Sequence, residues 1–165
     1  MPEKVFAQIL SEVNAFAGSA CDLTALQNFI VETIQQRLPY YNWTGFYMLD
    51  SNDPKTLVLG PFRGEPTEHV RIPVSQGICG AAVALNDTLI VDDVNSNPRY
   101  LACSVKTKSE IVVPVRANGA VVGEIDIDSH DLAAFSIQDR EFLEGCAAIV
   151  GDFIERIQTR SSGST

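Results

Sequence analysis

The segment "EIVVPVRANGAVVGEIDIDS", residues 110–129, decides the fold class of this chain. Two runs rich in valine and isoleucine flank the sequence "RANGA", and strands favour such β-branched residues. The dipeptide Asn118-Gly119 between them is the strongest hairpin signal in the chain, because Asn and Gly tolerate the positive φ angles of a tight two-residue turn. The segment therefore predicts two antiparallel strands joined by a short turn.

Four acidic residues accompany this predicted hairpin. Side chains alternate between the two faces of a strand, so Glu124, Asp126 and Asp128 share one face of the second strand. Glu110 begins the first strand and adds a fourth acid to the cluster. Two interpretations remain open on spacing alone: a solvated face of an antiparallel sheet, or a site that uses negative charge or a carboxyl proton of raised pKa.

The segments on either side of the hairpin complete an α+β domain. Periodicity and turn residues predict helices at 3–17, from 22 or 24 to 38, at 77–86 and at 136–157, and strands at 42–50, 56–62, 69–74 and 88–94. Either Asp22 or Thr24 caps the second helix, and Ser136 with Asp139 forms a capping-box variant at the start of the last. We expect a central, mostly antiparallel sheet with the terminal helices on one face, and the short helix and a long loop (95–109) on the other. Residues 1–160 are expected to form one domain, followed by a disordered polar tail at 161–165.

Composition excludes several classes of partner. The chain has 165 residues and a net charge of −9, and binding to nucleic acids or anionic membranes requires clustered basic residues instead. No apolar run approaches the roughly 18 residues of a membrane span. Charged residues interrupt the N-terminal segment, which argues against a signal peptide. We therefore expect a cytoplasmic protein that binds neither nucleic acid nor membrane.

Two of the four cysteines are candidates for chemistry. Cys103 lies in the long predicted loop near two lysines, whose charges would lower the pKa of its thiol. Cys79 lies in "GICGA", in the first turn of the short helix, where the helix dipole also favours a thiolate. The alternatives are a loop cysteine without a role and a small buried side chain. Cys146 is expected in the core, and Cys21 has no polar group around it.

Two aromatic residues and two histidines are candidates for contacts with a ligand or a metal ion. Trp43 and Tyr47 share one face of a predicted strand, where they either pack in the core or form an aromatic wall against a ligand. His69 and His130 lack partners at metal-ligand spacing. We expect no metal ion and no cofactor.

Several motifs together resemble the free methionine-(R)-sulfoxide reductases, which are stand-alone GAF domains that reduce the R epimer of free methionine sulfoxide. The motifs are "NWTGFY", "LVLGPF", "VRIPVSQGICG", "VDDV", "ACSVKTKSEIVVPV" and "GEIDIDS". They occur in the family's order between about residues 42 and 130. The pieces "SEIVVP" and "IDIDS" distinguish this family from signalling GAF domains.

The resemblance implies a set of site residues. It makes Cys103 the catalytic cysteine and Cys79 a second cysteine, Glu110, Asp126, Asp128 and Asp92 the acids of the substrate pocket, and Trp43 and Tyr47 its aromatic wall. The family's usual resolving cysteine is absent, because His69 occupies its position.

The implied reaction is thiol-dependent. Thiolate Cys103 attacks the sulfoxide sulfur, Glu110 or Asp128 protonates the departing oxygen, and the products are methionine and a sulfenic acid. Either Cys79 forms a disulfide that a thioredoxin-like dithiol reopens, or an external thiol reduces Cys103 directly. The alternatives are a non-catalytic GAF sensing module and a degenerate reductase. GAF domains often dimerise, so we expect a homodimer.

Overall fold

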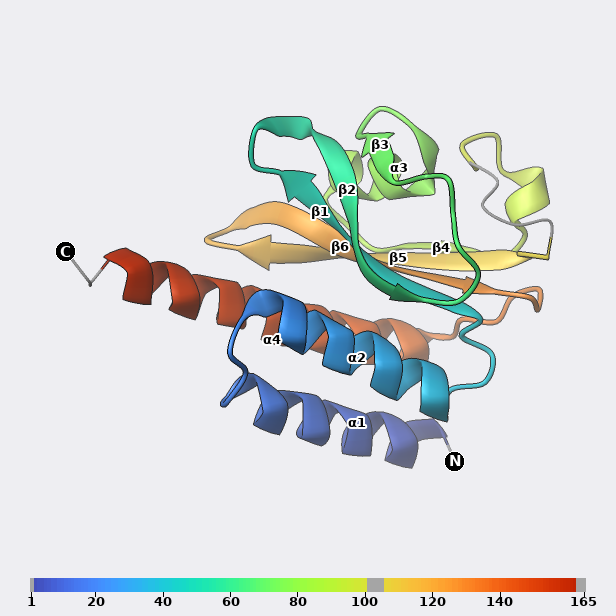
Figure 1. Cartoon of the computed structure of the whole chain (residues 1–165). Coiled ribbons are helices and arrows are strands. Elements are labelled where there is room, and N and C mark those ends of the chain that lie inside the picture. Colours follow the sequence, from blue (N-terminus) through green and yellow to red (C-terminus); the bar gives the residue numbers. More distant parts are fainter. Residues whose placement is uncertain (1, 101–105, 163–165) are drawn as a thin grey trace.

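Six strands form one antiparallel sheet in the order β3-β2-β1-β6-β5-β4 (Figure 1). The structure is a computed structural model, and it describes residues 2–100 and 106–162. The strands are β1 (Trp43–Asp50), β2 (Asp53–Arg63), β3 (Arg71–Pro73), β4 (Leu89–Val91), β5 (Ser109–Ala117) and β6 (Ala120–Ser129). Every strand pair is antiparallel, which confirms the predicted α+β class.

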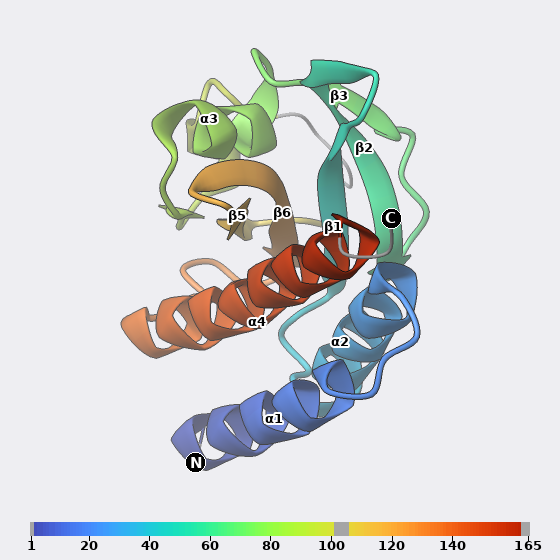
Figure 2. The same ribbon diagram turned by 90° about the vertical axis from the view of Figure 1, so that its left-hand side faces the viewer.

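The helices lie on both faces of this sheet. They are α1 (Pro2–Ala17), α2 (Leu23–Arg37), α3 (Gly77–Leu85) and α4 (Ile137–Ser162), with a short 3-10 turn, η1 (Val94–Ser96). Figures 1 and 2 show α2 and α4 on one face, α1 beyond them and α3 on the opposite face. The predicted placement of the terminal helices on one side is confirmed, although α1 packs mainly on α2 and α4 rather than on the sheet.

The β5–β6 hairpin turns at the predicted dipeptide. Asn118 has a φ of 53° and Gly119 a φ of 79°, which are the left-handed conformations that a two-residue hairpin turn requires. The backbone N–H of Asn118 also donates to a carboxylate oxygen of Glu155 on α4. The hairpin is thereby tied to the long C-terminal helix.

Side-chain caps define where two helices begin. Asp22 is the N-cap of α2, and its carboxylate accepts from the backbone N–H of Ala25 at 2.8 Å, which decides between the two predicted caps. Before α4, the backbone N–H of Ser136 donates to Asp139, and the backbone N–H of Asp139 donates to the Ser136 hydroxyl. This reciprocal pair is the predicted capping box.

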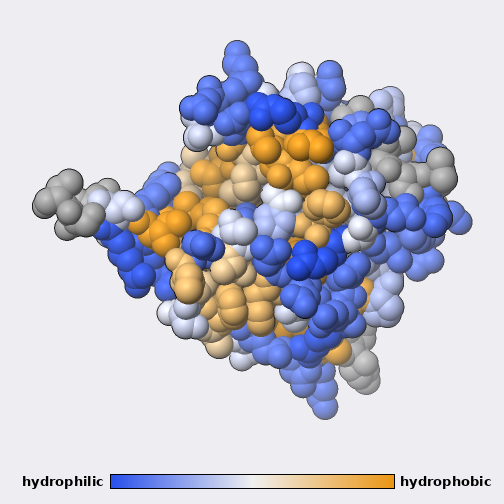
Figure 3. Space-filling view, in the orientation of Figure 1, coloured by the Kyte–Doolittle hydropathy of each residue, from blue (hydrophilic) through white to orange (hydrophobic). Residues whose placement is uncertain are grey.

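Two hydrophobic cores lie on opposite faces of the sheet. The larger core lies between the sheet and helices α1, α2 and α4, and it contains Cys146, whose pKa is raised to about 12 by burial. The smaller core lies between the sheet and α3, and it contains Trp43, Tyr47 and Cys79. In the view of Figure 3, apolar surface lies in front of the half-buried strand β2, with hydrophilic residues along the molecule's outer edges.

Several element ends differ from the prediction. Strands β3 and β4 contain three residues each, and β2 already begins at Asp53 within the expected turn. Helix α4 continues to Ser162, beyond its predicted end at residue 157 and into the first two residues of the expected tail at 161–165, while residues 163–165 lie outside the described part. Arg160 in the last turn favours this extension, because its charge complements the negative end of the helix dipole. Among the described residues, no helix combines the length and apolarity needed to cross a membrane.

Candidate active site

Strand register brings the predicted acids and aromatic residues to one face of the sheet. Residues directly opposite each other in an antiparallel pair project to the same side. In that register Asp128 is opposite both Glu110 and Trp43, Asp126 is opposite Gly45, and Glu124 is opposite Tyr47. The shared face is the one that α3 covers, because the Cys79 thiol of α3 contacts Asp126. The predicted cluster of four acids is therefore confirmed as a spatial group.

The four acids are buried. Glu124 is 0% exposed, Asp126 and Asp128 are 2% exposed, and Glu110 is 4% exposed. Both carboxylate oxygens of Glu124 and one oxygen each of Asp126 and Asp128 have no hydrogen-bond partner among the described residues. Glu124, Asp126 and Asp128 form no ion pair within residues 2–100 and 106–162. The solvated-face interpretation is wrong, and a buried charge of this kind requires a proton or a ligand.

Burial changes the protonation of these carboxyl groups. It raises the pKa of Glu124 and of Asp128 well above the usual range, and the neighbouring charge of Asp126 raises both further. Burial also raises the pKa of Asp126. Carboxyl groups of raised pKa hold protons at a pH where exposed acids are ionised, so this pocket contains potential proton donors.

Replacing Glu124 tests this protonation through stability. A carboxyl group whose pKa is higher in the folded than in the unfolded state stabilises the fold below its unfolded-state pKa of about 4. That contribution is lost as the pH rises toward the folded-state pKa. We expect Glu124→Gln to raise the free energy of unfolding near pH 8, where ionising a carboxyl group in this pocket costs most and a neutral amide carries no such cost. The gain shrinks near pH 5. Thermal melts at both pH values check this, with exposed Glu141→Gln as the control, and an equal gain at both values contradicts it.

Cys79 lies in the first turn of α3, as predicted, with its thiol directed at the acids. The thiol donates to a carboxylate oxygen of Asp126 at 3.4 Å, and the residue is 5% exposed. Burial raises the pKa of Cys79 well above its ordinary value, and the charges of Asp126, Glu124 and Glu110 add to the effect. The predicted thiolate character is therefore wrong for this state, because burial and three acids outweigh the helix dipole.

A glycine allows α3 to lie this close to the sheet. A Cβ atom on Gly80 would lie 2.6 Å from the backbone oxygen of Val74. This contact is too short for any larger residue, so the "GICGA" sequence permits the approach that places Cys79 over Asp126.

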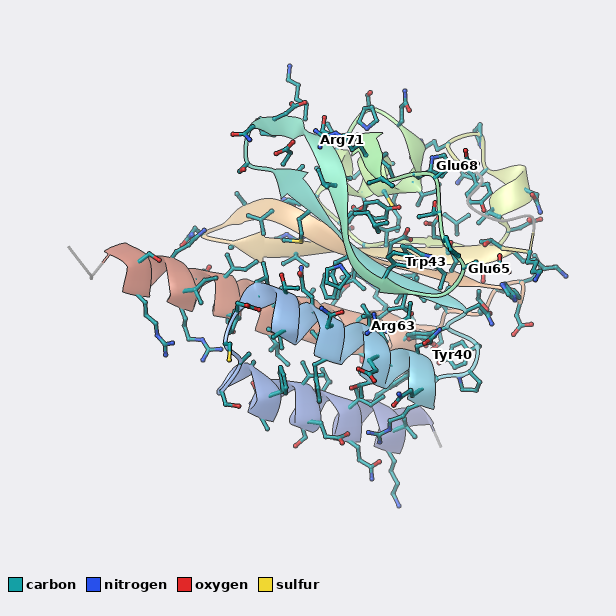
Figure 4. The ribbon with its side chains drawn as sticks, in the orientation of Figure 1. Tyr40, Trp43, Arg63, Glu65, Glu68 and Arg71 are labelled. Atoms are coloured by element: carbon teal, nitrogen blue, oxygen red, sulfur yellow. The ribbon has the colours of Figure 1, made fainter. Side chains whose placement is uncertain are left out.

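The predicted aromatic residues divide into two roles. Trp43 is 8% exposed, stacks on Phe62 at a centroid distance of 5.5 Å and borders the pocket that contains Asp128. Its indole N–H donates to the backbone oxygen of Glu65, which lies beside it in Figure 4. Tyr47 is 0% exposed, and its hydroxyl donates to the backbone oxygen of His69. Trp43 thus lines the opening, whereas Tyr47 supports the wall from within the core.

Gly45 provides the space that the Trp43 ring occupies. A Cβ atom at this position would lie 2.5 Å from the ring. We expect Gly45→Ala to displace the indole and to cost about 1–3 kcal/mol of stability, as overpacking does. Trp43 is the only tryptophan, so its fluorescence should shift in wavelength. The control is Gly18→Ala, whose added Cβ makes only an ordinary 3.4 Å contact. An unchanged emission spectrum for Gly45→Ala contradicts this account.

The opening above the acids is small and polar. A pocket of about 40 Å³ reaches Asp128 and is lined by Asn42, Trp43, Glu65, Thr67, Thr107, Asp128 and His130. A hollow of about 840 Å³ lies between α1 and α4, and another of about 530 Å³ lies beside the start of α3. None of the four buried acids lines either hollow. The acids, rather than the size of a hollow, therefore identify the candidate site.

The remaining predicted residues have different positions. Cys103 lies outside the described residues, so its predicted role stays a prediction. Among its described neighbours in sequence, Tyr100 packs against the smaller core and Thr107 lines the pocket. Asp92 follows β4, and its side chain is exposed and does not line the pocket. His69, at the position of the usual resolving cysteine, is half-buried.

The site residues implied by the resemblance did not include Glu124, although strand alternation places it on the same face as Asp126 and the structure buries it in the same cluster. Cys79, Glu110 and Asp126 place one potential metal-ligand atom each within 4.8 Å of one another. The expectation of no metal considered only histidine spacing, and residues 79, 110 and 126 are too far apart in sequence for such a search to connect them.

Comparison with known proteins places this chain in a family. The GAF domain family model matches residues 20–155, and the chain belongs to the GAF domain family. Its homologues include the free methionine-R-sulfoxide reductases, which are oxidoreductases. The enzyme of Saccharomyces cerevisiae is 36% identical over 153 residues, covering 90% of this chain and 84% of that protein. The enzyme of Escherichia coli is 38% identical over 144 residues, covering 87% and 84%.

A solved structure supports the same relationship. The free methionine-R-sulfoxide reductase of Neisseria meningitidis in complex with its substrate has a TM-score of 0.91 and 31% sequence identity to this chain. The match covers 97% of this chain and 94% of that one. The resemblance inferred from the motifs is confirmed.

Proposed function

We propose that this protein reduces the R epimer of free methionine sulfoxide to methionine, with a cysteine thiol as the electron donor. The observation that carries this proposal is the buried group Glu110, Asp126 and Asp128 beside the Trp43 ring. Such a pocket supplies protons and negative charge next to an apolar wall. A free amino acid that carries an ammonium group, a methyl group and a sulfoxide oxygen matches all three properties.

In the proposed first step, the thiolate of Cys103 attacks the sulfoxide sulfur. A neutral carboxylic acid, Glu110 or Asp128, transfers its proton to the sulfoxide oxygen as the sulfur–oxygen bond breaks. The hydroxide released in this way attacks the Cys103 sulfur, the bond between the two sulfurs breaks, and methionine leaves with its electron pair. The sulfoxide is thereby reduced to methionine, and Cys103 is oxidised to a sulfenic acid. The raised pKa of Asp128 supports this role, because burial keeps its proton available. Asp126 is proposed to bind the substrate's ammonium group, and Trp43 forms the apolar wall, which Tyr47 supports from within the core.

In the proposed second step, Cys79 resolves the sulfenic acid. Its sulfur attacks the Cys103 sulfur, a disulfide forms and water leaves. Asp126 is placed to accept the Cys79 proton, because the thiol already donates to it. A dithiol reductant such as thioredoxin then reopens the disulfide. In the alternative route an external thiol attacks Cys103 directly, and the raised pKa of Cys79 favours that route in the resting state.

A single-turnover assay tests the proposal. Pre-reduced protein is mixed with each free methionine sulfoxide epimer without added reductant, and methionine formed and thiols lost are counted. We expect methionine from the R epimer only. Two thiols lost per methionine indicate a Cys79–Cys103 disulfide, and one indicates a lone sulfenic acid with external resolution. No methionine from either epimer refutes the enzyme and leaves the non-catalytic sensing module.

The same assay addresses the degenerate-reductase alternative. A reductase that lacks every resolving route still completes one turnover and then stops, whereas an intact enzyme continues when a dithiol is supplied.

We further propose a homodimer in the cytoplasm, and light scattering of the purified protein tests the oligomeric state.

A further inference from the structure

Three side chains with metal-binding atoms converge on the pocket from three different elements. Cys79 comes from α3, Glu110 from β5 and Asp126 from β6, and one ligand atom of each lies within 4.8 Å of the others. In the tetrahedral geometry of Zn²⁺, ligand atoms at about 2.0–2.3 Å from the ion are about 3.3–3.8 Å apart, so side-chain adjustments of about 1 Å suffice. All three residues are at most 5% exposed, on elements held by sheet pairing and helix packing.

A fourth side chain is independent evidence for a positively charged ligand of this group. Glu124 is 0% exposed, its charge acts on the Cys79 thiol, and neither of its oxygens has a hydrogen-bond partner among the described residues. One oxygen of Asp126 is also without a partner, and no described lysine, arginine or histidine pairs with Glu124 or Asp126. The pocket thus holds spare carboxylate oxygens next to a sulfur.

The donor set selects the kind of ion. Mg²⁺ and Ca²⁺ prefer oxygen ligands alone, whereas a thiolate combined with carboxylates suits Zn²⁺ and the softer ions of similar geometry. We propose that this pocket binds one thiophilic divalent cation, Zn²⁺ or Cd²⁺, through Cys79, Glu110 and Asp126, with Glu124 as a further carboxylate. The metal and a sulfoxide substrate exclude each other, because both need Glu110 and Asp126. The cation therefore inhibits the proposed reductase, although its binding does not depend on that activity.

Cd²⁺ is the probe, because a cadmium–thiolate bond absorbs in the ultraviolet. The experiment uses the double variant Cys21→Ser/Cys103→Ser, in which Cys79 and the core residue Cys146 are the remaining thiols. We expect one Cd²⁺ per chain with a charge-transfer band that Zn²⁺ displaces. Adding Cys79→Ser should abolish the band. Asp126→Asn and Glu110→Gln should each weaken binding by at least about tenfold, as the loss of a supporting group does at known sites.

The matched control is Glu141→Gln on α4, which replaces an exposed acid outside the pocket and should leave binding unchanged. Circular dichroism checks that each variant is folded. The proposal is overturned if no band forms, if the band persists without Cys79, or if the Asp126 and Glu110 variants bind as tightly as the parent. Because the readout is spectroscopic, these outcomes are independent of whether methionine sulfoxide is reduced.

Discussion

Cys103→Ser is expected to abolish methionine formation from free methionine-(R)-sulfoxide, with a loss of at least about 10³-fold in turnover, because a hydroxyl cannot replace the thiolate nucleophile. A serine also cannot form the sulfenic acid that a second thiol reduces with loss of water. The loss should appear in the first turnover, before any resolving step. Pre-reduced protein without added reductant therefore gives the cleanest measurement.

Two other cysteine variants make this prediction specific. Cys21→Ser changes an exposed residue and should leave turnover unchanged. Cys79→Ser should retain the first turnover, and should slow only the later ones if Cys79 is the resolving thiol. Full activity of Cys103→Ser in repeated turnover refutes the assigned nucleophile, and equal losses in the first turnover for Cys79→Ser and Cys103→Ser refute the division of roles.

Replacing the proton donor is expected to have the second-largest effect. Glu110→Gln or Asp128→Asn, whichever removes the donor, should lower kcat by about 10²–10⁴-fold, the usual contribution of a positioned general acid. Asp126→Asn should mainly raise KM, because its proposed partner is the substrate's ammonium group. The matched control is again Glu141→Gln.

The pH profile identifies which of the two acids is the donor. A general acid works only while it carries its proton, so activity should fall as pH rises through its pKa. Burial and the charge of Asp126 raise the pKa of Asp128, so with Asp128 as the donor this loss of activity should occur well above the ordinary carboxyl range. The variant that removes the donor should lose this high-pH limb, and the other should keep it. If both variants keep wild-type kcat and the limb, neither residue is the donor.

The local sequence determined much of this protein. The Asn118-Gly119 turn and the Ser136–Asp139 capping box form as predicted, and Asp22 is one of the two predicted caps of α2, because each feature depends on residues within a few positions of one another. The shared face of the acids follows from the two-residue period of a strand, which no distant contact alters. The family resemblance, too, was readable from short motifs in order.

Only the tertiary structure decided what that acidic face meets. Cys79 and Asp126 are 47 positions apart in sequence. Helix α3 covers the acidic face through this contact and through its packing on β5 and β6. That cover excludes water from the four acids, raises the pKa of Cys79 and turns a plausible solvated surface into a buried site. It also separates Trp43, at the opening, from Tyr47, in the core. The alternation of side chains along a strand determines which of them share a face, but the exclusion of solvent depends on every element that packs on that face.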